Sequence, residues 1–181
     1  MNVSKIVGTV LIVFLHIPLI VSIWTGKKKQ PFSTWALLCS LNTLTLFSVL
    51  KTHGNWQPIA IYVIANAIIA TSVLLQGQFY WGSLEYYCCG LIMFCICVWI
   101  ISGPQIATIA SSLSIVIASF PQLRDSWNDP RSNPWLVWIG FTFANAISTA
   151  GGIEWSIEER FYGTTCTVLC AFRAGTSLIH K

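Results

Sequence analysis

The amino-acid sequence predicts an all-α integral membrane protein with seven transmembrane helices, arranged as two parallel three-helix bundles joined by a linker helix. Three observations lead to this prediction. Of the 181 residues, 55% are apolar and only 9% are Asp, Glu, Lys or Arg, whereas a soluble domain has about 25% charged residues. The apolar residues form seven long segments, and an internal repeat relates the early segments to the late ones. The low charge excludes a soluble globular enzyme, a disordered chain and a disulfide-stapled secreted module.

Each apolar segment has about the length of a membrane-spanning helix, which needs about 20 residues. The segments cover residues 6–24, 31–50, 58–76, 84–101, 105–124, 134–151 and 159–178. They are too long and too poor in strand alternation for a β-barrel. The first segment lacks a small-residue cleavage site before its basic flank, so we expect a retained span rather than a signal peptide. Pro31, Pro58 and Pro134 stand at the expected helix starts, where proline is ordinary.

The seven cysteines all fall inside apolar segments. Cys95 and Cys97 have no histidine or carboxylate near them in the sequence, so their spacing does not predict a metal site. We expect the cysteines to be small buried apolar residues. The sequence predicts neither a metal nor a cofactor.

The basic residues are distributed unevenly between the two ends of the predicted helices. One end carries Lys5, Lys51 and Arg160. The other end carries seven basic residues: Lys27, Lys28, Lys29, Arg124, Arg131, Arg173 and Lys181. The positive-inside rule makes the second end cytoplasmic. We therefore expect an outside N-terminus and a cytoplasmic C-terminus in a plasma (bacterial inner) membrane, and no nucleic-acid partner.

An internal repeat without gaps relates residues 16–42 to residues 119–145. Five identities share one separation of 103 positions: Pro18 with Pro121, Trp24 with Trp127, Pro31 with Pro134, Trp35 with Trp138, and Asn42 with Asn145. Proline, tryptophan and asparagine are uncommon in apolar segments, so this register indicates a duplication. The match fades in the third segment of each half. We predict a first three-helix repeat over residues 1–78, a linker helix over 79–103 and a second repeat over 104–181, parallel to the first.

The stretch FPQLRDSWNDPRSNPWLVW, residues 120–138, resembles the Pro-Gln signature of the PQ-loop superfamily. The first half carries the same frame as Ile17-Pro18-Leu19, with leucine in place of the glutamine. The plan of three, one and three helices resembles the SWEET sugar facilitators. The superfamily also includes transporters of cationic amino acids and cystine as well as trafficking receptors, and nicotinamide riboside transporters share a similar fold. The resemblance implies a membrane transporter and leaves the substrate open.

Polar residues near the middle of the predicted spans are the candidate substrate-binding residues. At a rise of about 1.5 Å per residue, Asn42 and Asn145 lie about half way across a core of about 30 Å. Asn66, His16 and Ser119 fall at a similar depth. Polar side chains there are costly unless they face one another or a water-filled path, and transporter sites lie at the midplane between repeats. The alternative is interhelical hydrogen bonding for the asparagines, and a satisfied histidine rather than a proton-coupling group for His16.

Two tryptophans and a pair of proline positions complete the candidate set. Trp35 and Trp138 precede the asparagines by seven residues and share nearly the same helix face. They predict an aromatic plate for a sugar ring or a nucleoside base, with anchoring at the membrane interface as the alternative. Pro18 and Pro121 cannot donate a backbone hydrogen bond within their helices, so together with Gln122 they are candidate hinges, with static kinks as the alternative.

These features predict a facilitator that carries a small neutral polar solute, such as a sugar, by alternating access between the two repeats. No acidic residue lies within the middle of a span, so the usual device for proton or sodium coupling is missing. The alternatives are a vitamin, nucleoside or amino-acid transporter and a non-transporting receptor with a partner at residues 125–133. The sequence contains no catalytic motif that would predict an enzyme. The expected partners are the solute and the lipid bilayer, and homo-oligomerisation stays open.

Overall fold

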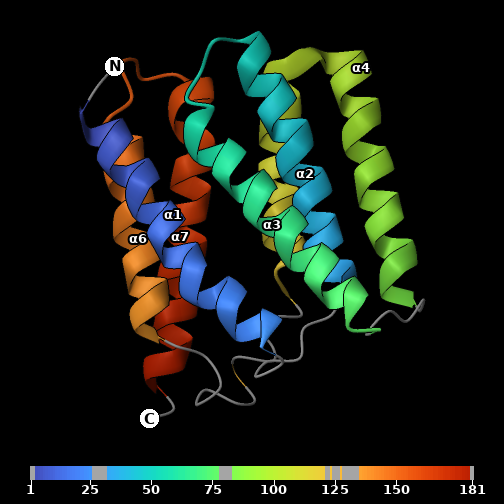
Figure 1. Ribbon diagram of the computed structural model, residues 1–181. Helices are drawn as coiled ribbons and strands as arrows, with labels where there is room; N and C mark the ends of the chain where they lie inside the picture. The colour runs from blue at the N-terminus through green and yellow to red at the C-terminus, as the bar shows by residue number, and fades with distance from the viewer. Residues whose placement is uncertain are drawn as a thin grey trace.

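The computed structural model describes residues 3–25, 32–77, 83–120, 123, 127 and 135–179. All regular structure among these residues is helical, which confirms the all-α prediction. Within the described residues there are six helices: α1 (Val3–Trp24), α2 (Phe32–Lys51), α3 (Gln57–Leu75), α4 (Ser83–Ala118), α6 (Trp135–Ala150) and α7 (Ile157–Ile179). They run side by side along one axis, so that α1 begins at the upper end in Figure 1 and α7 finishes at the lower end.

Four of the described helices are long and apolar enough to cross a membrane: α1, α2, α3 and residues 89–118 of α4. Large apolar side chains such as Phe14, Phe143 and Val168 lie exposed on the outside. Polar side chains, among them Asn42 and Asn145, lie buried inside. Outward apolar and inward polar side chains suit a lipid environment, where polar groups turn toward the bundle interior. The structure is therefore compatible with an integral membrane protein.

Helix α4 is interrupted at Gly103. This residue has φ 81° and ψ 178°, a conformation that glycine adopts readily because it has no Cβ. Pro104 follows and has no N–H to continue the helical hydrogen bonds. Figure 1 shows a first arm (residues 83–102) rising to this point and a second arm (residues 104–118) returning downward. The interruption coincides with the sequence-predicted boundary between linker helix and second repeat.

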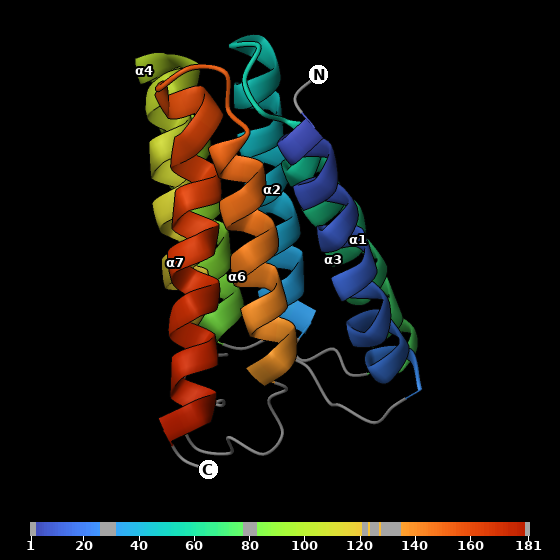
Figure 2. The ribbon, with the colours of Figure 1, turned by 90° about the vertical axis from the view of Figure 1, so that its left-hand side faces the viewer.

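The helices pack in a closed circuit around the core. Helix α1 contacts α3 and α6, α2 contacts α3 and α4, and α7 contacts α6 and α4. Figure 2 shows α1 and α3 together on one side and α4 and α7 together on the other. The first arm of α4 touches α2, where the Lys51 ammonium lies 4.5 Å from the centre of the Trp99 ring. The cavity described below lies inside this circuit.

Candidate solute-binding cavity

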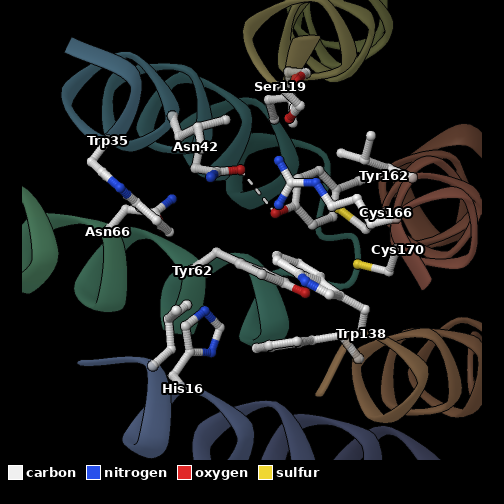
Figure 3. A pocket seen from close by; sticks show the side chains of 16 residues that line it. His16, Trp35, Asn42, Tyr62, Asn66, Ser119, Trp138, Tyr162, Cys166 and Cys170 are labelled. Atoms are coloured by element: carbon white, nitrogen blue, oxygen red, sulfur yellow. Dashed lines mark hydrogen bonds between the residues drawn. The ribbon is translucent and has the colours of Figure 1, made fainter. Parts of the chain in front are cut away.

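A cavity with about 60 Å³ of room for the centres of water molecules lies inside the helix circuit. Six of the seven sequence-predicted binding residues line it: His16, Trp35, Asn42, Asn66, Ser119 and Trp138. They come from α1, α2, α3 and α6, and from the turn directly after α4, and Figure 3 shows them around a common centre. The structure thus brings these six together.

The seventh predicted residue, Asn145, lies behind the cavity wall rather than in its lining. Its side chain is 1% exposed. Its amide nitrogen donates to the Tyr62 hydroxyl and to the Phe141 carbonyl, each at 2.8 Å. Because Tyr62 and Phe141 both line the cavity, Asn145 orients lining residues from behind the wall.

Asn42 forms the corresponding pair on the other side. The Tyr162 hydroxyl donates to the Asn42 side-chain oxygen at 2.8 Å, the bond drawn in Figure 3. Asn42 belongs to the first half of the chain and Tyr162 to the second, whereas Asn145 belongs to the second and Tyr62 to the first. Two Asn–Tyr pairs therefore cross between the halves. The Asn42 amide group and the Tyr62 hydroxyl keep hydrogens that can be donated toward a ligand.

The two tyrosines could not be found in the sequence comparison because their separation differs from that of the asparagines. Asn42 and Asn145 are 103 positions apart, but Tyr62 and Tyr162 are 100 apart. A comparison without gaps at 103 positions therefore does not align the tyrosines. Asn66 and Cys166 are also separated by 100 positions, and both line the cavity. A comparison that allows one short gap would align both of these pairs.

His16 is held inside the bundle by local contacts. Its Nδ1 atom lies 2.8 Å from the carbonyl oxygen of Ile12. A carbonyl only accepts, so Nδ1 carries the hydrogen and Nε2 of the neutral ring is an acceptor. The ring meets Tyr62 and Phe141 edge-on, at centroid distances of 5.1 and 4.8 Å. These contacts favour the satisfied-histidine interpretation over proton coupling.

Arg173 corrects the expectation that all basic residues lie at helix edges or in loops. It lines the cavity, is 6% exposed, and its guanidinium carbon lies 4.4 Å from the centre of the Trp138 ring. Side chains on a helix tilt toward its N-terminus, so a long side chain near the end of α7 reaches back toward the middle. Arg173 was assigned to the cytoplasmic end from the position of its backbone in the sequence alone.

Several contacts join the helices at the upper end of the molecule, and we call them the upper seal. The ammonium of Lys5 lies 2.6 Å from a carboxylate oxygen of Glu159. Asn55 donates its backbone N–H to the Glu158 carbonyl at 3.3 Å and its side-chain amide to Ser148 at 3.4 Å. These contacts tie α1 to α7, and the turn after α2 to α6 and α7.

Gln105 and Glu158 also interact at this end of the molecule. Gln105 donates a short hydrogen bond to the Glu158 carboxylate. The pKa of Glu158 is lowered, first by the hydrogen bond from its own backbone N–H and also by the bonds from Ser156 and Gln105.

Gly8 is required by a close approach, because a Cβ there would lie 2.6 Å from the backbone nitrogen of Ser148. Helices α1 and α6 thus pack backbone to backbone beneath the seal.

Among the hinge candidates, Pro18 lies within α1, which stays helical through it. Pro121 and Gln122 lie outside the described residues, as do residues 128–134 of the loop before α6. The matched hinge therefore stays a prediction. Leu19, which follows Pro18, lines the cavity.

The cysteines differ in part from the sequence expectation. Cys95, Cys166 and Cys170 are buried as expected, but Cys89 and Cys97 are exposed. The exposed pair lies on the first arm of α4, which sits outside the helix circuit and so turns most of its faces outward. Within the described part of the chain, no group of three or more His, Cys, Asp or Glu side chains could hold a metal ion.

Comparisons with protein-family models, with curated proteins and with solved structures give no match to this chain.

Proposed function

We propose that this chain is a membrane transporter that carries a small polar solute through the cavity by alternating access. The observation that carries the proposal is the pair of crossed Asn–Tyr hydrogen bonds at one cavity between the two halves. Each half contributes equivalent residues at or beside the wall, which are His16 with Ser119, Trp35 with Trp138, Asn42 with Asn145, and Tyr62 with Tyr162. Transporters built from repeats form their sites in this way, at the interface of the repeats.

The proposed architecture is the seven-span plan of two parallel three-helix repeats, as the resemblance to PQ-loop and SWEET proteins implies. The interruption at Gly103 supports it by dividing α4 into a linker arm and an arm that belongs to the second half. The packing supports it as well. Helix α3 contacts both α1 and α2, and α7 contacts both α6 and α4. In each half the third helix thus lies between the other two.

Alternating access requires one end to open while the other closes. The upper seal joins the two halves and closes that end in this conformation. The lining reaches Trp35 and Trp138 in the first turns of α2 and α6, close to the lower end, which the charge count makes cytoplasmic. We therefore assign this conformation to the state closed on the outer face of a plasma membrane, with Pro18 as a flexible point in α1.

Passive flux is the expected mode of transport. No described carboxylate lines the cavity, and a mid-membrane carboxylate is the usual device for coupling to protons or sodium. His16 donates to a backbone carbonyl and packs between two aromatic rings, which leaves it poorly placed to exchange protons with water.

Uptake into liposomes tests the proposal. Purified protein would be reconstituted and supplied with labelled sugars, nucleosides, amino acids and small organic acids. We expect saturable uptake of one class, and a decrease of about fivefold or more in Asn42→Ala, because that variant strands the Tyr162 hydroxyl and removes a donor from the wall. Val168→Ala, on the exposed face of α7, is the matched control and should transport normally.

Absence of flux for every class, with folded and reconstituted protein, would overturn the transporter proposal. Binding of a peptide or protein partner in that case would establish the receptor alternative. Equal uptake by wild type and Asn42→Ala would remove the crossed pairs from the site.

A further inference from the structure

Asn66 on α3 brings a side-chain amide to the cavity wall that has no hydrogen-bond partner among the described residues. The side chain is 3% exposed and lines the cavity, and no hydrogen bond joins it to another residue that the structure describes. An asparagine amide has two N–H donors and an oxygen acceptor. Burying such a group without partners costs free energy. The Asn66 amide is therefore available to a molecule inside the cavity.

The fold does not require an amide at this position. The counterpart of Asn66 at a separation of 100 positions is Cys166. Cys166 also lines the cavity, so the second half fills the equivalent position with a thiol. A polar residue inside a membrane protein is costly, and such residues mark substrate pathways. The amide of Asn66 thus points to ligand recognition rather than to packing.

Three other groups at the wall have hydrogen-bonding capacity that no described residue uses. They are the Asn42 side-chain nitrogen, the hydrogen of the Tyr62 hydroxyl and the Nε2 acceptor of His16. Figure 3 shows these side chains and Asn66 around the common centre of the cavity. With Asn66 they supply three donor groups and two acceptors. The other polar lining residues already have interactions within the protein: Ser119, Tyr162 and Arg173.

The remaining surface of the wall is largely aromatic. Six of the sixteen described lining residues carry rings: His16, Trp35, Tyr62, Trp138, Phe141 and Tyr162. Contacts with centroid distances of 4.8 to 6.3 Å join five of these rings into one group, from which only Trp35 stands apart. Aromatic side chains bind flat rings by offset stacking and by edge-to-face contacts. The wall therefore favours a flat ring with few polar groups.

We propose that the cavity recognises a flat, uncharged ring with adjacent N–H and C=O groups, as in the free pyrimidine base uracil. The inference rests on the proposed transport function and names its substrate class. Uracil has two N–H and two C=O groups. The Asn66 amide can pair with one N–H and its neighbouring C=O, while His16 can accept from the other N–H and Asn42 can donate to the other C=O. A sugar has more hydroxyl groups than the wall has partners, which leaves some of them unpaired and costly.

A series of probes tests the inference on the wild-type protein. The probes are uracil, 1,3-dimethyluracil, uridine and glucose. We expect uracil to raise the thermal unfolding midpoint in a concentration-dependent way, since a ligand that binds the native state stabilises it. 1,3-Dimethyluracil keeps the flat ring but has no N–H, so its shift should be small. A shift with 1,3-dimethyluracil equal to that with uracil would overturn the hydrogen-bonding assignment, and a larger shift with uridine would overturn the free base.

The variant Asn66→Leu localises the effect. We expect it to weaken uracil binding and to lower labelled uracil uptake into liposomes about tenfold or more, because two hydrogen bonds to the ligand are lost. Without ligand its unfolding midpoint should not fall, since the Asn66 amide bonds no described residue. Ile64→Ala, at an exposed position of the same helix, is the matched control and should bind uracil normally.

The outcomes separate this inference from the proposed function. Saturable glucose uptake by a protein that does not bind uracil would overturn the ring assignment and leave the transporter standing. A lower unfolding midpoint for ligand-free Asn66→Leu, with unchanged uracil binding, would make Asn66 a packing residue and overturn the assignment as well. Absence of binding and flux for every class of solute would overturn both. If Asn66→Leu does not fold, the probe series on the wild-type protein still decides the question.

Discussion

Breaking the ion pair between Lys5 and Glu159 should open the upper seal. The charged atoms lie 2.6 Å apart, and the two side chains are only 8% and 10% exposed. A charge-assisted hydrogen bond of this kind contributes about 1.5–3 kcal/mol. If the pair forms only in the closed state, Lys5→Met lowers the ratio of closed to open molecules by about 10- to 150-fold.

Hydrogen exchange at Asn55 reports the opening directly, because its backbone N–H donates to the Glu158 carbonyl within the seal. We expect exchange of the peptide over residues 52–56 to accelerate by a similar factor in Lys5→Met. Lys51→Met is the matched control. It removes a basic residue at the same end of the molecule, but one that stacks on Trp99 of the neighbouring α4 arm and takes no part in the seal.

The swapped variant Lys5→Glu with Glu159→Lys should restore slow exchange, since it rebuilds the pair with the charges reversed. Unchanged exchange at Asn55 in a folded Lys5→Met protein would refute the reasoning. It would show that backbone packing between α1 and α6 keeps the end closed and that the ion pair contributes little.

Three other predictions concern the crossed pairs and the glycines. Tyr62→Phe and Tyr162→Phe should each lower stability by about 1 kcal/mol and reduce solute uptake to similar extents; thermal unfolding and liposome flux measure this, and an effect of only one variant contradicts the equivalence of the pairs. Gly8→Ala should destabilise the fold by about 1–3 kcal/mol, because its Cβ would meet the α6 backbone at 2.6 Å. The control Gly90→Ala has nothing within 4 Å of the added Cβ, so it should be neutral or slightly stabilising in the same thermal unfolding measurement. Gly103→Ala should cost about 1 kcal/mol or more because of the positive φ at that residue, and an unchanged melting temperature would mean that the turn relaxes.

Most of the cavity was predictable from the sequence because five identities share one separation of 103 positions. That separation indicated Asn42, Trp35 and Trp138, which line the cavity, and Asn145, which lies behind its wall. Tyr62 and Tyr162 were missed because they are 100 positions apart and so fall outside that separation. Spacing along the chain shows a duplication only where no residues have been gained or lost.

The errors have separate physical causes. Arg173 was placed by its backbone position, although an arginine side chain extends several ångströms from its Cα toward the N-terminal side of its helix. Cys89 and Cys97 were expected to be buried because their segment is apolar. An apolar helix in a membrane protein often faces lipid, so apolar character alone does not distinguish the interior from the lipid surface.

The crossed Asn–Tyr bonds have a consequence for folding. Each bond joins an asparagine of one half of the chain to a tyrosine of the other, so neither half by itself holds either of these bonded pairs. The two bonds can therefore form only once both halves have come together, and the wall of the cavity is completed late rather than within one half.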